Sequence, residues 1–113
     1  MTLGELPVHF VTEEQAMALR SDHGLVVTEI SGNPELLFGE MSRALEFPDY
    51  FGHNWDAVDE CLRDIETEKP IALLVRNAAR HWQNEPAEMA TLVDAWLAAA
   101  ADRGADLHLV FVW

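Results

Sequence analysis

The chain has 113 residues and a formal net charge of −13, with 7 lysines and arginines against 20 aspartates and glutamates. Half of the residues are apolar, which favours one folded domain over a disordered acidic tail. The charge argues against a nucleic-acid partner or an anionic membrane surface, because both are bound through basic patches. No apolar run approaches the roughly 20 residues of a membrane span.

The sequence also bears on compartment and cofactor. Residues 1–11 show neither the basic nor the apolar segment of a secretory signal. Cys61 is the single cysteine, so no internal disulfide can form. These features favour a reducing compartment, and we expect a cytoplasmic protein. Neither GxGxxG nor GxxxxGK occurs, so we expect no nucleotide site and no cofactor.

Hydrophobic periodicity and turn residues predict alternating strands and helices. In chain order we expect a strand around residues 8–10, a helix at Glu13–Arg20, a strand at 25–30, a helix from Pro34 to near Phe47, a loop at 48–54, a helix at about 54–65, a strand at 71–75, a short helical turn within 77–84, a helix from Pro86 closed by Gly104, and a strand at 107–113. Because the strands are separated by helices, they are predicted to form a mainly parallel sheet.

Three local signals support these boundaries. Thr12 followed by Gln15 fits a capping box at the start of the first helix. Pro48 disfavours helix in the residue before it. The apolar stripe predicted for the last helix consists of Met89, Leu92, Val93, Trp96, Leu97 and Ala100.

Charge is concentrated in one part of the chain. Residues 46–68 hold eight acids and one base, so this fifth of the sequence carries a net charge of −7. The acids are Glu46, Asp49, Asp56, Asp59, Glu60, Asp64, Glu66 and Glu68, and the base is Arg63. Such a segment in a folded domain indicates either a solvated helix face or a surface for a basic partner.

The helix predicted at residues 54–65 divides its side chains between two faces. The apolar side consists of Trp55, Val58, Cys61, Leu62 and Ile65. The acids lie on the other side, where Arg63 relieves part of their repulsion from four residues after Asp59 and three after Glu60. The aromatic loop at residues 50–54 runs directly into this acidic face. Exposed aromatic side chains beside charges are typical of protein interfaces.

Residues 47–62 read Phe-Pro-Asp-Tyr-Phe-Gly-His-Asn-Trp-Asp-Ala-Val-Asp-Glu-Cys-Leu. This stretch resembles the barstar family of ribonuclease inhibitors, whose pattern there is Leu-Pro-x-Tyr-Tyr/Phe-Gly-x-Asn-Leu/Trp-Asp-Ala-Leu-x-Asp-Cys-Leu. The Pro, Tyr, Gly, Asn, Asp-Ala and Cys-Leu positions match at unbroken spacing. The order of elements agrees from about Leu25 to Trp113, while residues 1–24 lie outside the resemblance as an added strand and helix.

The resemblance implies one barstar-like α/β domain over residues 1–113. Residues 25–113 form its family core, a three-stranded parallel sheet packed with helices, and residues 1–24 form an N-terminal strand–helix extension. It further implies a monomer that occludes the basic active site of a microbial ribonuclease in a 1:1 complex within the producing cell. Asp56 and Glu60 then take the places of RNA phosphates, and Tyr50 and Asn54 are loop contacts. The partner-binding set is Tyr50, Gly52, His53, Asn54, Asp56, Asp59, Glu60, Arg63 and Asp64.

The chain departs from the family pattern at several positions, among them the family's frequent second Cys, which is Ala105 here. Glu60 replaces a family Asp, and Asp59 replaces a family Trp. An acid that the family contributes from its late helix falls at Ala99 here, so that contact is missing. The shifted contacts suggest a different ribonuclease, or an immunity protein that neutralises another toxin nuclease.

Two other classes of function remain as alternatives. His53, Asp56 and Glu60 stand at i, i+3 and i+7, so they could share one face and bind Zn²⁺ or Mn²⁺. Asp56 and Glu60 could be the acid–base pair of a hydrolase. The sequence has no nucleophile elbow, Cys–His signature or Gly-rich loop to support catalysis, and Cys61 lies on the apolar side of its helix. We therefore expect neither an enzyme nor a metal site.

Overall fold

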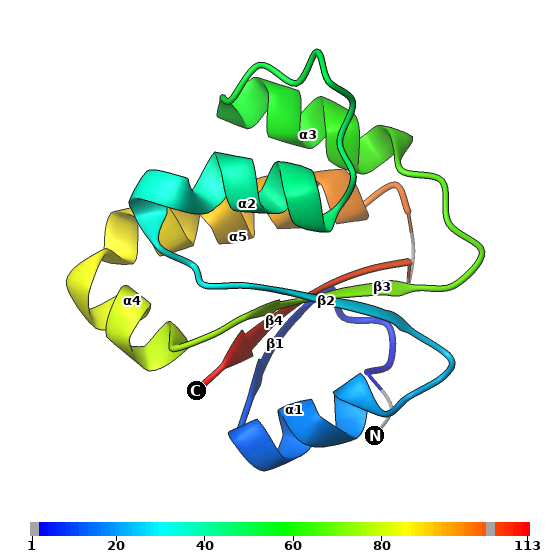
Figure 1. Cartoon of the computed structure of the whole chain (residues 1–113), viewed down its shortest axis with the longest axis vertical. Helices are drawn as coiled ribbons and strands as arrows, with labels where there is room; N and C mark the ends of the chain where they lie inside the picture. Colours follow the sequence, from blue (N-terminus) through cyan, green and yellow to red (C-terminus); the bar gives the residue numbers. More distant parts are fainter. Residues whose placement is uncertain (1–2, 104–105) are drawn as a thin grey trace.

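A computed structural model of the chain describes residues 3–103 and 106–113. Its backbone forms a parallel sheet with helices on both faces (Figure 1). The elements are β1 (Val8–Val11), α1 (Glu13–Arg20), β2 (Val26–Ile30), a 3₁₀ turn (Pro34–Leu36), α2 (Leu37–Ala44), α3 (Trp55–Asp64), β3 (Ile71–Val75), α4 (Ala78–Asn84), α5 (Pro86–Ala100) and β4 (Leu107–Val112).

The sheet has four strands in the order β1-β4-β3-β2, and every neighbouring pair is parallel. The expected α/β class with a parallel sheet is confirmed, but the three-stranded sheet is wrong. β1, predicted as part of an N-terminal extension outside the three-stranded family core, pairs with β4 from Val8↔Leu109 to Val11↔Val112. This pairing makes β4 an interior strand, which explains why all of its residues are buried.

The direction of the crossovers explains why helices cover both faces. The chain moves from β2 to β3 to β4 in one direction across the sheet, whereas β1 to β2 runs in the opposite direction. Right-handed crossovers that run in opposite directions lie on opposite faces. Accordingly, α1 lies on one side of the sheet, and α2, α3 and α5 lie on the other (Figure 1).

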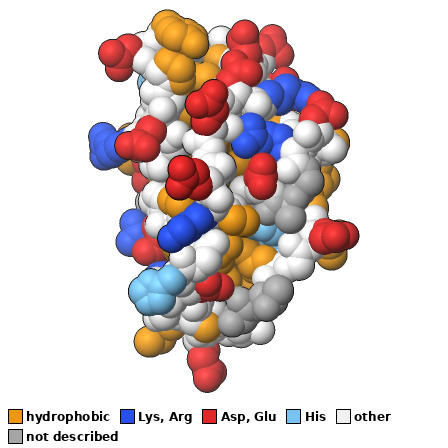
Figure 2. Space-filling model, turned by 90° about the vertical axis from the view of Figure 1, so that its right-hand side faces the viewer, with side chains coloured by type: hydrophobic (Ala, Val, Ile, Leu, Met, Phe, Trp, Pro, Cys, Tyr) orange, Lys and Arg blue, Asp and Glu red, His pale blue; other side chains and the backbone are white. Residues whose placement is uncertain are grey.

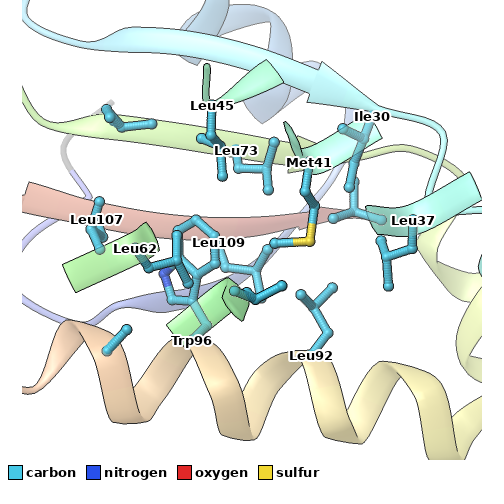
Figure 3. Packing of buried hydrophobic residues seen from close by; sticks show 14 of the residues in the cluster. Ile30, Leu37, Met41, Leu45, Leu62, Leu73, Leu92, Trp96, Leu107 and Leu109 are labelled. Atoms are coloured by element: carbon cyan, nitrogen blue, oxygen red, sulfur yellow. The ribbon is translucent and has the colours of Figure 1, made fainter. Parts of the chain in front are cut away.

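Two hydrophobic cores fill the space between the sheet and these helices. The larger core lies under α2, α3 and α5, with Trp96 of α5 fully buried beside Leu62 and Leu109 (Figure 3). The smaller core lies under α1, where Ala16 and Leu19 are fully buried against the other face of the sheet. The N-terminal strand and helix therefore complete the second core.

Local signals were accurate at some helix ends and misleading at others. The capping box of Thr12 and Gln15 is confirmed, with both reciprocal hydrogen bonds present. The helix predicted from Pro34 to near Phe47 is divided into a 3₁₀ turn and α2. Leu97 is 43 % exposed, so its place in the predicted apolar stripe is wrong, and Ala99 is buried instead. The predicted stop at Gly104 lies outside the described residues.

Histidines join β1 to β4 on the α1 side. His9 Nε2 lies 3.1 Å from His108 Nδ1, and burial together with the neighbouring His108 lowers the pKa of His9. This contact links the N-terminal strand to the strand added last along the chain. Within the described residues, no helix has the length and apolar character that a bilayer crossing requires.

Candidate functional site

The loop between α2 and α3 is anchored from below by two phenylalanines. Phe47 and Phe51 are both buried, and their ring centroids lie 5.0 Å apart. The Phe51 N–H donates to the Pro48 carbonyl oxygen at 2.9 Å and closes a turn. Tyr50, next to the core-facing Phe51, is 84 % exposed. The loop therefore presents one aromatic side chain to solvent from a firmly packed base.

Asn54 ties this loop to the start of α3. Its side-chain Oδ1 accepts the Ala57 N–H at 2.8 Å, and its Nδ2 donates to the Gly52 carbonyl oxygen at 2.7 Å. A Cβ on Gly52 would lie only 3.3 Å from Asn54 Nδ2, so glycine leaves room for this bond. His53 between them has a φ of 34°, and its ring centroid lies 5.1 Å from that of Phe51.

The two faces predicted for α3 are confirmed. Val58, Cys61 and Leu62 are buried, and the helix packs against α5. The exposed acids Asp56, Glu60 and Asp64 follow one another at intervals of four residues, which places them in one stripe along the helix. Among the described residues, none of these three carboxylates has a hydrogen-bond or ion-pair partner.

Asp59 and Arg63 are engaged within the chain. Arg63 Nε donates to Asp59 Oδ2 at 2.9 Å, its guanidinium donates to the Ala98 carbonyl oxygen at 2.9 Å, and it also pairs with Asp102. Its hydrogen bond to Asp59 is the main cause of a raised Arg63 pKa. These bonds fasten α3 to the end of α5. Ala99, the position at which the resemblance would place an acid, is fully buried.

A pocket of about 360 Å³ opens between the loop and α3. Its apolar side chains come from Leu45, Phe47, Pro48, Phe51, Ala57, Cys61 and Ile65, and Tyr50 and Gly52 belong to its loop wall. Its carboxylates come from Glu46, Glu60, Asp64 and Glu66. Figure 2 shows acidic side chains spread over one face, with lysine or arginine side chains among those of the upper part and a hydrophobic patch at the top.

Cys61 belongs to the buried floor of this pocket. Burial raises the pKa of its thiol, and the nearby carboxylates of Glu60 and Asp64 raise it further. The sulfur therefore stays protonated at neutral pH, which is the opposite of what a nucleophilic cysteine requires. Its role in the structure is that of a small core side chain.

The structure does not support the metal alternative. Among the described residues there is no group of three or more His, Cys, Asp or Glu side chains that could hold a metal ion. His53 instead turns its ring toward Phe51 and Phe38, with the centroids 5.1 and 6.4 Å apart. His53, Asp56 and Glu60 therefore do not form the binding set that their spacing suggested.

Glu46 and Glu66 line the same pocket as Tyr50 and Glu60, although neither belongs to the partner-binding set predicted from sequence. Both lie near the ends of the acidic segment 46–68. The concentration of charge in this segment was the one sequence signal that pointed to them. Only the fold brings Glu46, shortly after α2, and Glu66, shortly after α3, to one pocket.

Comparison with known proteins identifies the family. A family model described as barstar (barnase inhibitor) matches residues 28–112. This range contains the loop, α3, β3 and β4 and leaves out β1 and α1. A search of curated proteins found no match. The family description names an inhibitor of barnase. The matched range covers most of the chain, and this protein therefore belongs to the barstar family.

Proposed function

We propose that this protein inhibits a microbial ribonuclease by covering its basic active site with α3 and the adjoining loop. The observation that carries the proposal is the unpaired stripe of Asp56, Glu60 and Asp64 beside the exposed Tyr50. The carboxylates are held at fixed intervals by the helix, so they can occupy positions that RNA phosphates take in the enzyme. The inhibitor itself performs no chemistry and needs no cofactor.

The shape of the site suits a protein partner. An exposed aromatic side chain beside charged side chains is typical of an interface hot spot. The loop and one helix can supply one side of an interface that buries roughly 1,200–2,000 Å² in total. We propose that the chain binds as a monomer in a 1:1 complex, in the cytoplasm of the cell that makes the nuclease. Gly52, His53 and Asn54 extend the contact along the loop.

A second candidate is an immunity protein for another toxin nuclease. One observation supports this candidate. Asp59 stands where the family has Trp, and its carboxylate is paired with Arg63. The family's aromatic contact is thus replaced by an internal ion pair, and the position of the late acid is buried at Ala99. An altered contact set of this kind suits an altered target.

Barnase, the ribonuclease named in the family description, is the probe for a direct test. We expect Asp56→Ala and Glu60→Ala each to weaken inhibition of RNA cleavage by about 2 kcal/mol or more, which is roughly 30-fold. Both side chains are exposed and unpaired, so the fold should be retained, as circular dichroism can verify. Glu14→Ala on α1 is the matched control, since it removes the same charge from the opposite side of the sheet.

Unchanged inhibition by the Asp56→Ala/Glu60→Ala double variant would refute the assignment of the site. If the wild-type chain leaves barnase fully active, the second candidate is favoured, and the same variants are then assayed against the nucleases of the source cell.

A further inference from the structure

The pocket between the loop and α3 combines an apolar floor with an acidic rim. Buried Phe47, Phe51 and Cys61 belong to the floor, and exposed Tyr50 stands in the wall. The rim carboxylates come from three separate segments. Glu46 follows α2, Glu60 and Asp64 lie on α3, and Glu66 follows α3. The residues that line the pocket include no lysine, arginine or histidine.

The four carboxylates of this rim are free to receive a cation. Within the described residues, none of them has a hydrogen bond or an ion pair. Two of these carboxylates, Glu60 and Asp64, act electrostatically on the pocket lining, because both raise the pKa of the Cys61 thiol. The nearest basic side chain on α3, Arg63, is occupied by Asp59, Asp102 and the Ala98 carbonyl. Arg43 lines a neighbouring pocket together with Glu46 but does not line this one, so the lining itself supplies no positive charge.

Glu46 occupies a backbone position that glycine normally fills. The Phe47 N–H donates to the Ser42 carbonyl oxygen at 2.9 Å, a 6→1 bond that ends α2, and Glu46 has the left-handed φ of 54° required at such a helix end. A side chain there costs conformational energy that glycine avoids. A glutamate at this strained position therefore indicates a role for its carboxylate beyond forming the turn.

We propose that this pocket receives an arginine side chain of the partner nuclease, and that Glu46 and Glu66 extend the binding site beyond α3. The inference rests on the proposed function and specifies the chemistry of the partner. Arginine fits better than lysine because its planar guanidinium can stack on Tyr50 and donate to carboxylates on several sides at once. Its aliphatic stem can lie along the apolar floor.

The pocket can be tested without the partner. N-acetyl-arginine methylamide is titrated into the ¹⁵N-labelled chain, with the neutral citrulline analogue as a matched probe. We expect the arginine probe to shift the amide resonances of Gly52, Cys61 and Ile65, and the citrulline probe to leave them in place. The Glu46→Gln/Glu66→Gln variant should abolish the arginine shifts, and Glu14→Gln/Glu35→Gln, whose side chains lie outside the pocket, should keep them. Equal shifts with both probes, or arginine shifts that survive in the pocket variant, would overturn the proposal.

The role in the complex is tested with barnase. We expect Glu46→Gln/Glu66→Gln to weaken inhibition about three- to tenfold, the effect of losing two partly exposed charge pairs. Inhibition equal to that of the wild type would remove these residues from the interface while leaving the proposed function intact. Arginine binding to a chain that fails to inhibit barnase would support the pocket and reject barnase inhibition, so the two proposals fail separately.

Glu46→Gly separates binding from folding. Glycine suits the left-handed φ at this helix end, so the thermal midpoint should be unchanged or higher. Binding of the arginine probe and inhibition of barnase should both decrease. A lower midpoint together with normal binding would show that Glu46 serves the helix end alone.

Discussion

Asn54 is the residue on which the geometry of the loop and that of α3 both depend. One end of its side-chain amide accepts the Ala57 N–H, and the other donates to the Gly52 carbonyl oxygen. The first bond satisfies an amide at the helix start that has no partner within the helix. The second holds the loop that carries Tyr50. A single side chain thus sets the position of the aromatic group relative to the acidic stripe.

Two substitutions at Asn54 should separate these two bonds. Asn54→Ala removes both and should lower the free energy of unfolding by about 1 kcal/mol, the usual cost of losing a helix cap. Asn54→Ser keeps an oxygen for the cap but has no group to reach the Gly52 carbonyl. We expect its stability in urea to match the wild type while its inhibitory complex with barnase dissociates faster. Equal dissociation rates for Asn54→Ser and wild type would show that the bond to Gly52 is dispensable.

Arg63 shows how far the sequence alone can predict a site at the scale of residues. Helical spacing identified its pairing with Asp59, because both lie on one helix. Its bonds to Asp102 and the Ala98 carbonyl join residues that are 35 or more positions apart, and no local pattern encodes them. The predicted partner contact of Arg63 stays untested, but its side chain already has three partners within the chain.

At the scale of elements, β1 and α1 close the side of the sheet that the other helices leave open. Val110 and Val112 of β4 point to this side and are buried together with Leu19 of α1. β1 covers the edge of β4 through parallel pairing. Although the family match begins only at residue 28, the segment before it supplies the helix side of the second core. Stability should therefore depend on α1 even though α1 lies far from the proposed interface.

Substitutions in α1 should reveal this dependence. Leu19→Ala removes a fully buried side chain and should lower the free energy of unfolding by about 2–5 kcal/mol. Met17→Ala on the same helix is the control, because Met17 is 60 % exposed and should change stability by less than about 0.5 kcal/mol. Denaturant unfolding measures both values. A small effect of Leu19→Ala would mean that the second core contributes little to folding. In either case, the folded fraction should bind barnase with wild-type affinity.

The positions of most elements were predictable because each carries its own pattern, such as the apolar run Ile71–Val75 or the cap at Asn54. The place of β1 was not. Its four residues show that a strand exists, but the sheet edge it joins depends on packing across the whole chain. The 3₁₀ turn before α2 was missed for a related reason, since Pro34 favours a helix start without fixing the hydrogen-bonding period that follows.

At the scale of the whole molecule, the negative charge is divided unequally between the two sides of the sheet. On the α1 side, Arg20 pairs with Glu13 and Glu29, which neutralises part of the acid there. On the α3 side, the carboxylates of the stripe and of the pocket have no partner among the described residues. A cationic enzyme would therefore be drawn to the face that carries the proposed interface, and the pull would act before contact.

The association rate should consequently fall as salt is added. The Debye length shrinks from about 30 Å at 0.01 M ionic strength to about 8 Å at 0.15 M, so attraction between separated charges is largely lost. Stopped-flow mixing with barnase should show at least about a tenfold decrease in the association rate constant over this range, and a much smaller change in dissociation. Asp56→Asn/Glu60→Gln should flatten the salt dependence more than Glu14→Gln/Glu35→Gln, which removes equal charge elsewhere. An association rate that ignores salt would contradict electrostatic steering, and equal slopes for the two double variants would place its source in the total charge and not in α3.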